Sequence, residues 1–96
     1  MKHFVLIKFE DNYFTDEVFI FTKNAFAEME ANIEEVYKLT VHRNCVVRDK
    51  NMDIMVEIDL DDEKALYAYL NHDLHQAFSK LMDEHVVNRV SFDYEN

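Results

Sequence analysis

The chain has 96 residues, a formal charge of −10 and a single cysteine, Cys45. Nucleic acid and anionic membrane partners need a clustered basic surface, and the ten lysines and arginines are scattered, so both partner classes are excluded. One cysteine also excludes an internal disulfide bond and a cysteine-rich zinc site. The opening segment does not resemble a secretory signal, and no apolar run approaches the roughly 20 residues that span a bilayer. We therefore expect one domain over residues 1–96, in the reducing cytoplasm.

The first half of the chain predicts a strand, a helix and a second strand. Residues 2–9 alternate but are apolar on both sides, so this strand is expected to be covered on both faces, by helices and by a second copy of the chain. Helical spacing of apolar residues predicts a helix at about residues 15–34, with Thr15 as its N-cap. Alternation predicts the next strand at residues 36–43.

The second half predicts two strands separated by a broken helix. Residues 52–60 alternate between an acidic face and an apolar face, which is expected to lie under the helices. A short helix capped by Asp61 or Asp62 precedes a second helix at about residues 73–85, and a last strand follows over residues 86–94. The second helix is expected to bury Leu74, Phe78, Leu81 and Met82. The order β-α-β-β-α-β, with the second helix split, is typical of an α+β ferredoxin-like fold with a four-stranded antiparallel sheet.

Glycine and proline are absent from the chain, which removes the usual turn residues. Asparagine and aspartate are then expected to supply the turns and any left-handed backbone positions, the first of them at Asp11-Asn12. A glycine-rich loop that cradles phosphates is excluded for the same reason.

Candidate catalytic residues gather around the predicted helix break. Tyr69 and His75 would lie ~120° apart on an unbroken helix and could not share a site. A break at Asn71 lets both side chains converge between helices and sheet, where His3 of the first strand is expected to point as well. A phenol and an imidazole facing an apolar cavity form a general acid–base pair for proton transfer next to a carbonyl group. The alternative is structural, because histidines at a helix junction also cap helices and fix turns.

Other sites are expected to be apolar or absent. If the space between helices and sheet is open, its walls are expected to bind a small apolar ligand through Val5, Ile7, Ile54, Val56 and Phe78. His72 and His75 stand at a spacing that suits a metal only in an unbroken helix, so neither a metal nor another cofactor is predicted. Cys45 lies near Arg43 and Arg48 but has no defined base beside it, and a nucleophilic role is not predicted.

The pattern Tyr-x-x-His-x-x-His-x-x-Phe over residues 69–78 resembles the signature of the stress-responsive A/B barrel (Dabb) family. The opening KHFVLIKF, the middle RNCVVRDKNMDIMVE and the closing RVSFDYE extend this resemblance over nearly the whole chain. It implies a stress-related protein whose ferredoxin-like monomers pair through their sheets into a dimeric α+β barrel. A minority of members are enzymes, among them a plant polyketide cyclase whose acid/base tyrosine and histidine resemble Tyr69 and His75, and whose strand histidine resembles His3.

The chain departs from this family pattern at two positions: Asp73 replaces a proline, and Asn51 stands where a glycine is usual. Arg89 and Ser91 also put polar groups where the pocket of the cyclase is apolar. The leading hypothesis is a stable homodimer that binds a small apolar ligand or none. The alternative is a cofactor-free enzyme, cyclase-like or monooxygenase-like, that uses the tyrosine and the histidines. A module that binds other proteins through its acidic surface is the third hypothesis.

Overall fold

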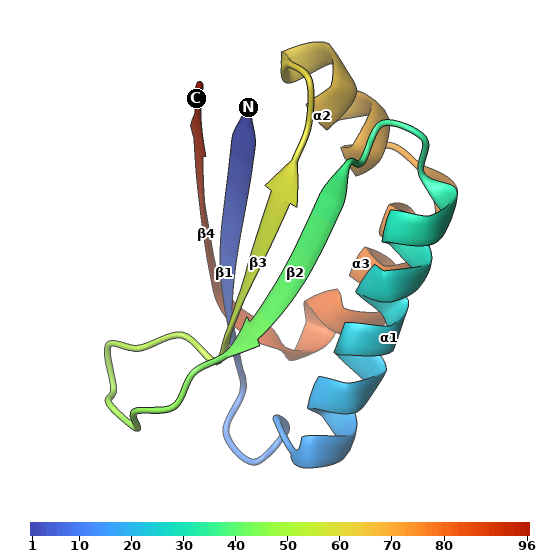
Figure 1. Cartoon of the computed structure of the whole chain (residues 1–96). Coiled ribbons are helices and arrows are strands. Elements are labelled where there is room, and N and C mark those ends of the chain that lie inside the picture. Colours follow the sequence, from blue (N-terminus) through green and yellow to red (C-terminus); the bar gives the residue numbers. More distant parts are fainter.

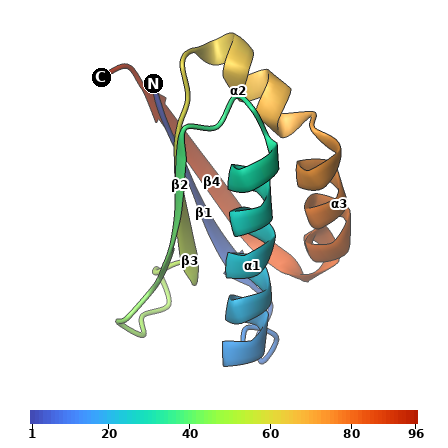
Figure 2. The ribbon, with the colours of Figure 1, turned by 45° about the vertical axis from the view of Figure 1, so that its right-hand side comes forward.

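A computed structural model describes all of residues 1–96, which form one sheet with the helices packed on one side of it (Figures 1 and 2). The strands are β1 (Lys2–Phe9), β2 (Lys38–Arg43), β3 (Ile54–Asp59) and β4 (Val86–Tyr94). The helices are α1 (Asp16–Asn32), α2 (Glu63–Leu70) and α3 (Asp73–Met82), followed by the 3₁₀ turn η1 (Asp83–His85). The predicted order of elements and the α+β class are confirmed. None of the three α-helices has both the length and the hydrophobicity that a membrane span requires.

Polar side chains set where the helices begin. Thr15, Asp62 and His72 each accept a hydrogen bond from a backbone N–H group in the first turn of the following helix. These bonds satisfy donors that have no partner within the helix. Asn12 is the only residue with a positive φ, 66°, so the asparagine at the first predicted turn does adopt the left-handed region. Asn51, which replaces the usual glycine, adopts no such backbone conformation.

The sheet has the strand order β2-β3-β1-β4, and all neighbouring strands are antiparallel. In the register, His3 lies between Ile58 on β3 and Asp93 on β4. Ile7 lies opposite Arg89 on β4 in the same way. Because β1 and β4 are antiparallel neighbours, the two termini lie at the same end of the sheet (Figure 1).

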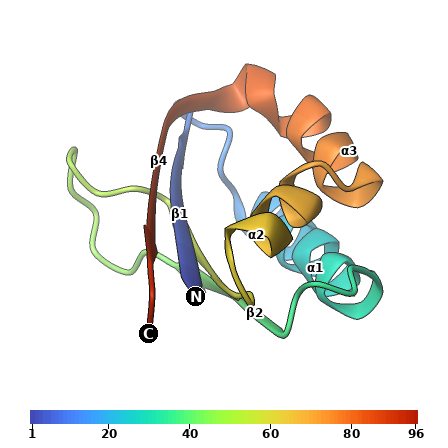
Figure 3. The same cartoon turned by 90° about the horizontal axis from the view of Figure 1, so that it is seen from above.

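The core lies between the sheet and the helices, as the view from above shows (Figure 3). Ile54, Val56 and Ile58 of β3 are at most 1% exposed, which confirms the predicted apolar face of this strand. Helix α1 packs Phe26 and Met29 onto them as part of the same buried cluster. The central strand therefore supplies the floor of the core, and burial of its branched side chains is a main source of folding free energy.

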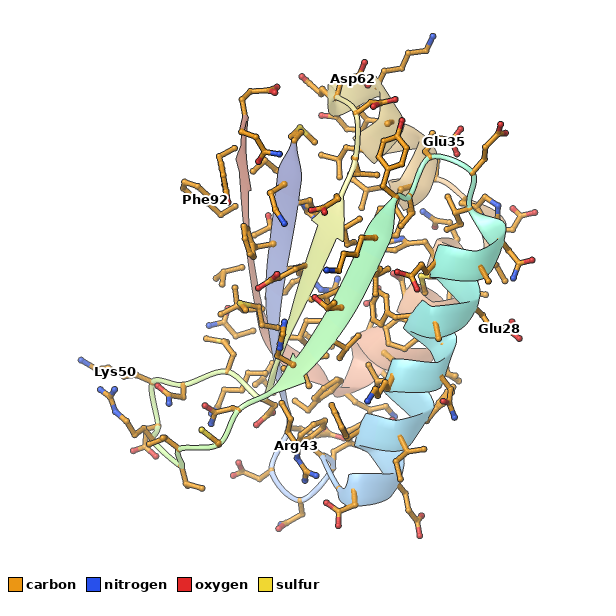
Figure 4. The ribbon with its side chains drawn as sticks, viewed as in Figure 1. Glu28, Glu35, Arg43, Lys50, Asp62 and Phe92 are labelled. Carbon is orange, nitrogen blue, oxygen red and sulfur yellow. The ribbon has the colours of Figure 1, made fainter.

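The opposite face of the sheet has no cover within the chain, and we call it the open face. It carries an apolar cluster on β1 and β4, in which the rings of Phe4 and Tyr94 stack 5.7 Å apart. Phe92 of this cluster is 65% exposed and points away from the helices (Figure 4). The other half of the open face is polar and includes the ion pair of Lys2 and Asp59. The strand predicted to need a cover on both faces thus receives only one from its own chain.

Helix α3 differs from its prediction in two respects. It ends at Met82, and the chain continues to residue 85 as a 3₁₀ turn. Phe78 and Met82 are buried as expected, but the prediction for Leu81 is wrong, because this side chain is 55% exposed. Leu81 lies at an open groove of about 560 Å³ between α1 and α3, which Phe21 lines from the other side. The apolar spacing of a helix therefore overstated the width of the face that it buries.

Candidate functional site

The candidate site is a cavity of about 190 Å³ between the sheet and helices α2 and α3. His3 of β1, Tyr69 of α2 and His75 of α3 all line it. The rings of Tyr69 and His75 lie 4.7 Å apart, and those of His3 and Tyr69 lie 6.4 Å apart. Three elements thus bring together the three side chains that the sequence singled out for acid–base chemistry.

The break between α2 and α3 makes this arrangement possible. Asn71 is the C-cap of α2, and the His72 ring accepts a hydrogen bond of 3.1 Å from the Leu74 backbone N–H group as the N-cap of α3. The helix axis changes direction there, so Tyr69 and His75 need not lie on different faces of one cylinder. Asp73 follows as the first residue of α3, a position at which a carboxylate is stabilised by the helix dipole.

His75 is held as a neutral imidazole with a defined tautomer. Its Nδ1 atom lies 3.0 Å from the carbonyl oxygen of Leu70, and since a carbonyl oxygen only accepts hydrogen bonds, Nδ1 carries the proton. Nε2 is then left with its lone pair. Burial lowers the pKa of His75 below its usual 6.5 and outweighs the hydrogen bond to Leu70, which acts in the opposite direction. The nearby positive charge of Arg89 also lowers this pKa. At neutral pH this side chain is therefore a proton acceptor.

Tyr69, in contrast to His75, is a hydrogen-bond donor that keeps its proton. Its side chain is 1% exposed, and burial raises the pKa of the phenol well above its usual 10. The hydroxyl group therefore stays protonated at every physiological pH. A protonated phenol beside a neutral imidazole provides one hydrogen-bond donor and one base in the same cavity.

His3 is paired with Asp93, a residue for which the sequence had suggested no role. The two face each other across the β1–β4 ladder, and His3 Nδ1 lies 2.5 Å from the Asp93 carboxylate. The carboxylate accepts a hydrogen bond from the Nδ1–H group, which orients the ring and directs Nε2 away from the pair. The side chain of His3 is 8% exposed, whereas that of Asp93 is 39% exposed, so the pair links the cavity to the surface. No local pattern could have revealed it, because the two residues are 90 positions apart.

The predicted ligand-binding residues divide into two groups. Val5, Ile7 and Phe78 line the cavity, together with Phe26 and Leu70. Ile54 and Val56 do not line it, because they lie on β3 in the closed part of the core. The cavity thus lies over β1 and β4, at one side of the covered face.

Polar side chains complete the lining at the β4 side. Arg89 and Ser91 face the cavity from β4, and Ser79 faces it from α3. The Arg89 guanidinium donates a hydrogen bond of 2.8 Å to Asp83, on the turn that follows α3. No group of three or more histidine, cysteine or acidic side chains lies close enough together to hold a metal ion. His72 and His75 face different partners, since one caps α3 and the other binds the Leu70 carbonyl.

The fold is shared with solved structures over nearly the whole chain. A dimeric ferredoxin-like protein of unknown function from Thermobifida fusca is 24% identical, with a TM-score of 0.83, and the match covers 99% of this chain and 89% of that one. A dimeric protein of unknown function from Bacteroides fragilis is 27% identical, with a TM-score of 0.77 and coverage of 99% and 94%. A Dabb family protein from Mesorhizobium loti is 19% identical, with a TM-score of 0.78 and the same coverage.

The comparison with curated proteins found no match. The family comparison did: the sequence matches the Stress responsive A/B Barrel Domain, Dabb, over residues 1–96. The predicted family resemblance is therefore confirmed, and the ferredoxin-like fold agrees with that of the solved structures. This chain belongs to the stress-responsive A/B barrel family.

Proposed function

We propose that this protein is a cofactor-free enzyme that transfers protons on a small carbonyl compound. The observation that carries the proposal is the shared cavity of Tyr69, His75 and His3, in which one group is held as a base and another as an acid. A purely structural set of residues would not require a base with a free lone pair beside a protonated phenol.

The chemistry follows from the two protonation states. Nε2 of His75 removes a proton from the carbon next to the substrate carbonyl group, and the C–H electron pair forms the new carbon–carbon double bond. The Tyr69 hydroxyl group donates a hydrogen bond to the carbonyl oxygen, where negative charge develops. His75 then returns its proton, and the catalyst is restored without a metal or an organic cofactor. His3, held by Asp93, orients the substrate from the sheet side.

A binding protein without catalysis is the second candidate, and the apolar walls of the cavity favour it. Val5, Ile7 and Phe78 present hydrocarbon to any occupant. The volume of about 190 Å³ lies below the roughly 300–1,000 Å³ of typical ligand pockets, so only a small molecule fits. In this case His75 serves to close the helix break through its bond to the Leu70 carbonyl oxygen.

The working unit in this proposal is a homodimer that forms through the open face of the sheet. The apolar cluster of β1 and β4 supports this assembly, and the neighbours from Thermobifida fusca and Bacteroides fragilis are described as dimeric. A dimer buries in both copies an apolar surface that each chain leaves in water. A cytoplasmic location and a role in stress response remain predictions.

The experiment that tests the proposal is hydrogen–deuterium exchange at carbon, followed by proton NMR in D₂O with pyruvate and hydroxyacetone as probes. The wild-type protein is expected to accelerate exchange. Tyr69→Phe and His75→Asn are each expected to lower the exchange rate about 100-fold or more. The asparagine amide can still donate to the Leu70 carbonyl oxygen, so His75→Asn deletes the base while keeping the hydrogen bond. The rate is also expected to fall as the pH drops through the lowered pKa of His75, because the imidazolium ion has no lone pair.

His72→Asn is the matched control, because asparagine is a good N-cap and His72 does not line the cavity. This variant is expected to keep both the exchange rate and the melting temperature. Folded Tyr69→Phe and His75→Asn variants with wild-type exchange would overturn the enzyme proposal. Unfolding of both variants would assign the two residues to the scaffold and favour the binding protein.

A further inference from the structure

The lining of the cavity carries a single permanent charge, and this charge is positive. Of the eleven residues that line it, Arg89 alone is always ionised, and none is aspartate or glutamate. The chain has 20 acidic residues among its 96, and none of them lines this cavity. Two carboxylates outside the lining, Asp83 and Asp93, are each engaged with a lining residue.

The Arg89 side chain is free to take a second partner. Its only hydrogen bond within the chain goes from one terminal nitrogen to Asp83, which leaves most of its five N–H donors without a protein acceptor. The side chains of Arg89 and Asp83 are 41% and 53% exposed. An ion pair this exposed contributes little to stability, so a ligand can share or displace Asp83 at little cost.

The polar groups around Arg89 suit an oxyanion. Ser79 and Ser91 line the cavity with hydroxyl groups that can donate hydrogen bonds, and the planar guanidinium group matches the two oxygens of a carboxylate. Ile7 lies opposite Arg89 in the β1–β4 register, so the charged end of the cavity adjoins its apolar wall. An occupant with one charged end and one short carbon skeleton satisfies both parts of the lining.

Resting on the function proposed above, we infer that the substrate class is a small carbonyl-containing carboxylate, and that Arg89 determines this specificity by binding the carboxylate group. The carbonyl carbon then lies between Arg89 and the acid–base pair of Tyr69 and His75. The volume of about 190 Å³ limits the carbon skeleton to a few atoms.

Binding of pyruvate and of its uncharged isostere pyruvamide tests this inference, measured by NMR titration of the backbone amide signals of the full chain. The wild-type protein is expected to bind pyruvate about tenfold more tightly than pyruvamide, since a hydrogen bond to a charged group is the difference between the two probes. Arg89→Gln is expected to abolish this preference. Arg89→Lys, the matched control, keeps the charge and is expected to retain part of it.

Asp83→Asn is an independent test of the inference. It removes the carboxylate that competes with the ligand for Arg89, and Asp83 does not line the cavity. It is expected to increase pyruvate affinity several-fold and to leave pyruvamide affinity unchanged. Equal affinity of the wild-type protein for both probes, or no detectable pyruvate binding at its highest usable concentration, would overturn the inference. So would a preference that survives Arg89→Gln.

The two proposals fail in different ways in these experiments. A charge preference without exchange at carbon retains Arg89 as an anion-binding residue and removes the enzyme function. Exchange with pyruvate and hydroxyacetone at equal rates, without a charge preference, retains the acid–base pair and removes the role of Arg89.

Discussion

The two faces of the sheet are built from the same four strands, but the helices cover only one of them. On the covered face, Val56 and Ile58 of β3 are completely buried by the helices. On the open face, Phe92 is 65% exposed and belongs to an apolar cluster that no part of the chain covers. Alternation along a strand decides on which face a side chain lies. Whether that face is shielded from solvent depends on whether another layer of structure packs against it.

The covered face is itself uneven, and the cavity lies where the cover is thin. The helices cover β3, whereas eight of the nine residues of β4, from Val87 onward, are exposed and only Val86 is partly buried. The polar residues His3 and Arg89 stand at this thinly covered side. Closed packing therefore supports the fold on one side, and incomplete packing leaves room for chemistry on the other.

Ile58→Ala is expected to have the largest effect on stability, because it deletes atoms from the closed part of the covered face. Removing a fully buried isoleucine leaves a cavity that costs about 2–5 kcal/mol. The free energy of unfolding in urea, followed by circular dichroism, measures the loss. Val90→Ala on the open face is the matched control, since Val90 is 45% exposed, and a similar loss there at concentrations that keep the chain monomeric would contradict the contrast between the faces.

Phe92→Glu tests the assembly proposed for the open face of the sheet. A carboxylate in the centre of the apolar cluster cannot be buried against a second copy without a large desolvation penalty. The dimer proposed above is therefore expected to dissociate while each monomer stays folded. Light scattering coupled to gel filtration measures the molecular mass. Ile20→Glu, at an exposed position on α1, is expected to leave the dimer intact. A wild-type chain that is monomeric at all concentrations would refute the assembly proposed for this face.

Thr22→Val is expected to have the smallest effect of the three substitutions, and it is expected to increase the stability of the fold. The Thr22 hydroxyl group is completely buried in α1 and has no hydrogen-bond partner. Replacing it with a methyl group of the same shape removes this unsatisfied group and is expected to stabilise the chain by about 1 kcal/mol. Thermal unfolding measures the change. Thr40→Val on the open face is the control, because the Thr40 hydroxyl group already pairs with His42 and no gain is expected there.

Much of the fold could be predicted because its signals act over a few residues. The N-cap bonds of Thr15 and Asp62 join each cap to a backbone N–H group three positions later, and the left-handed turn at Asn12 is a property of one residue. The alternation of β3 likewise identified its buried face. Helix α3 shows the limit, because Leu81 follows the apolar spacing but lies at a groove that the packing of α1 leaves open.

The sequence by itself determined the order of elements, the break at Asn71 and the identities of Tyr69, His75 and His3 as candidates. The family resemblance had already placed Arg89 and Ser91 at the pocket, but only the tertiary structure decided that Asp93 holds His3, since this contact depends on the pairing of the first strand with the last. It also decided that Ile54 and Val56 lie in the closed core, away from the cavity. The physical reason is that caps and turns are fixed by local hydrogen bonds, whereas strand register and the extent of helix cover are settled by packing between segments far apart in the chain.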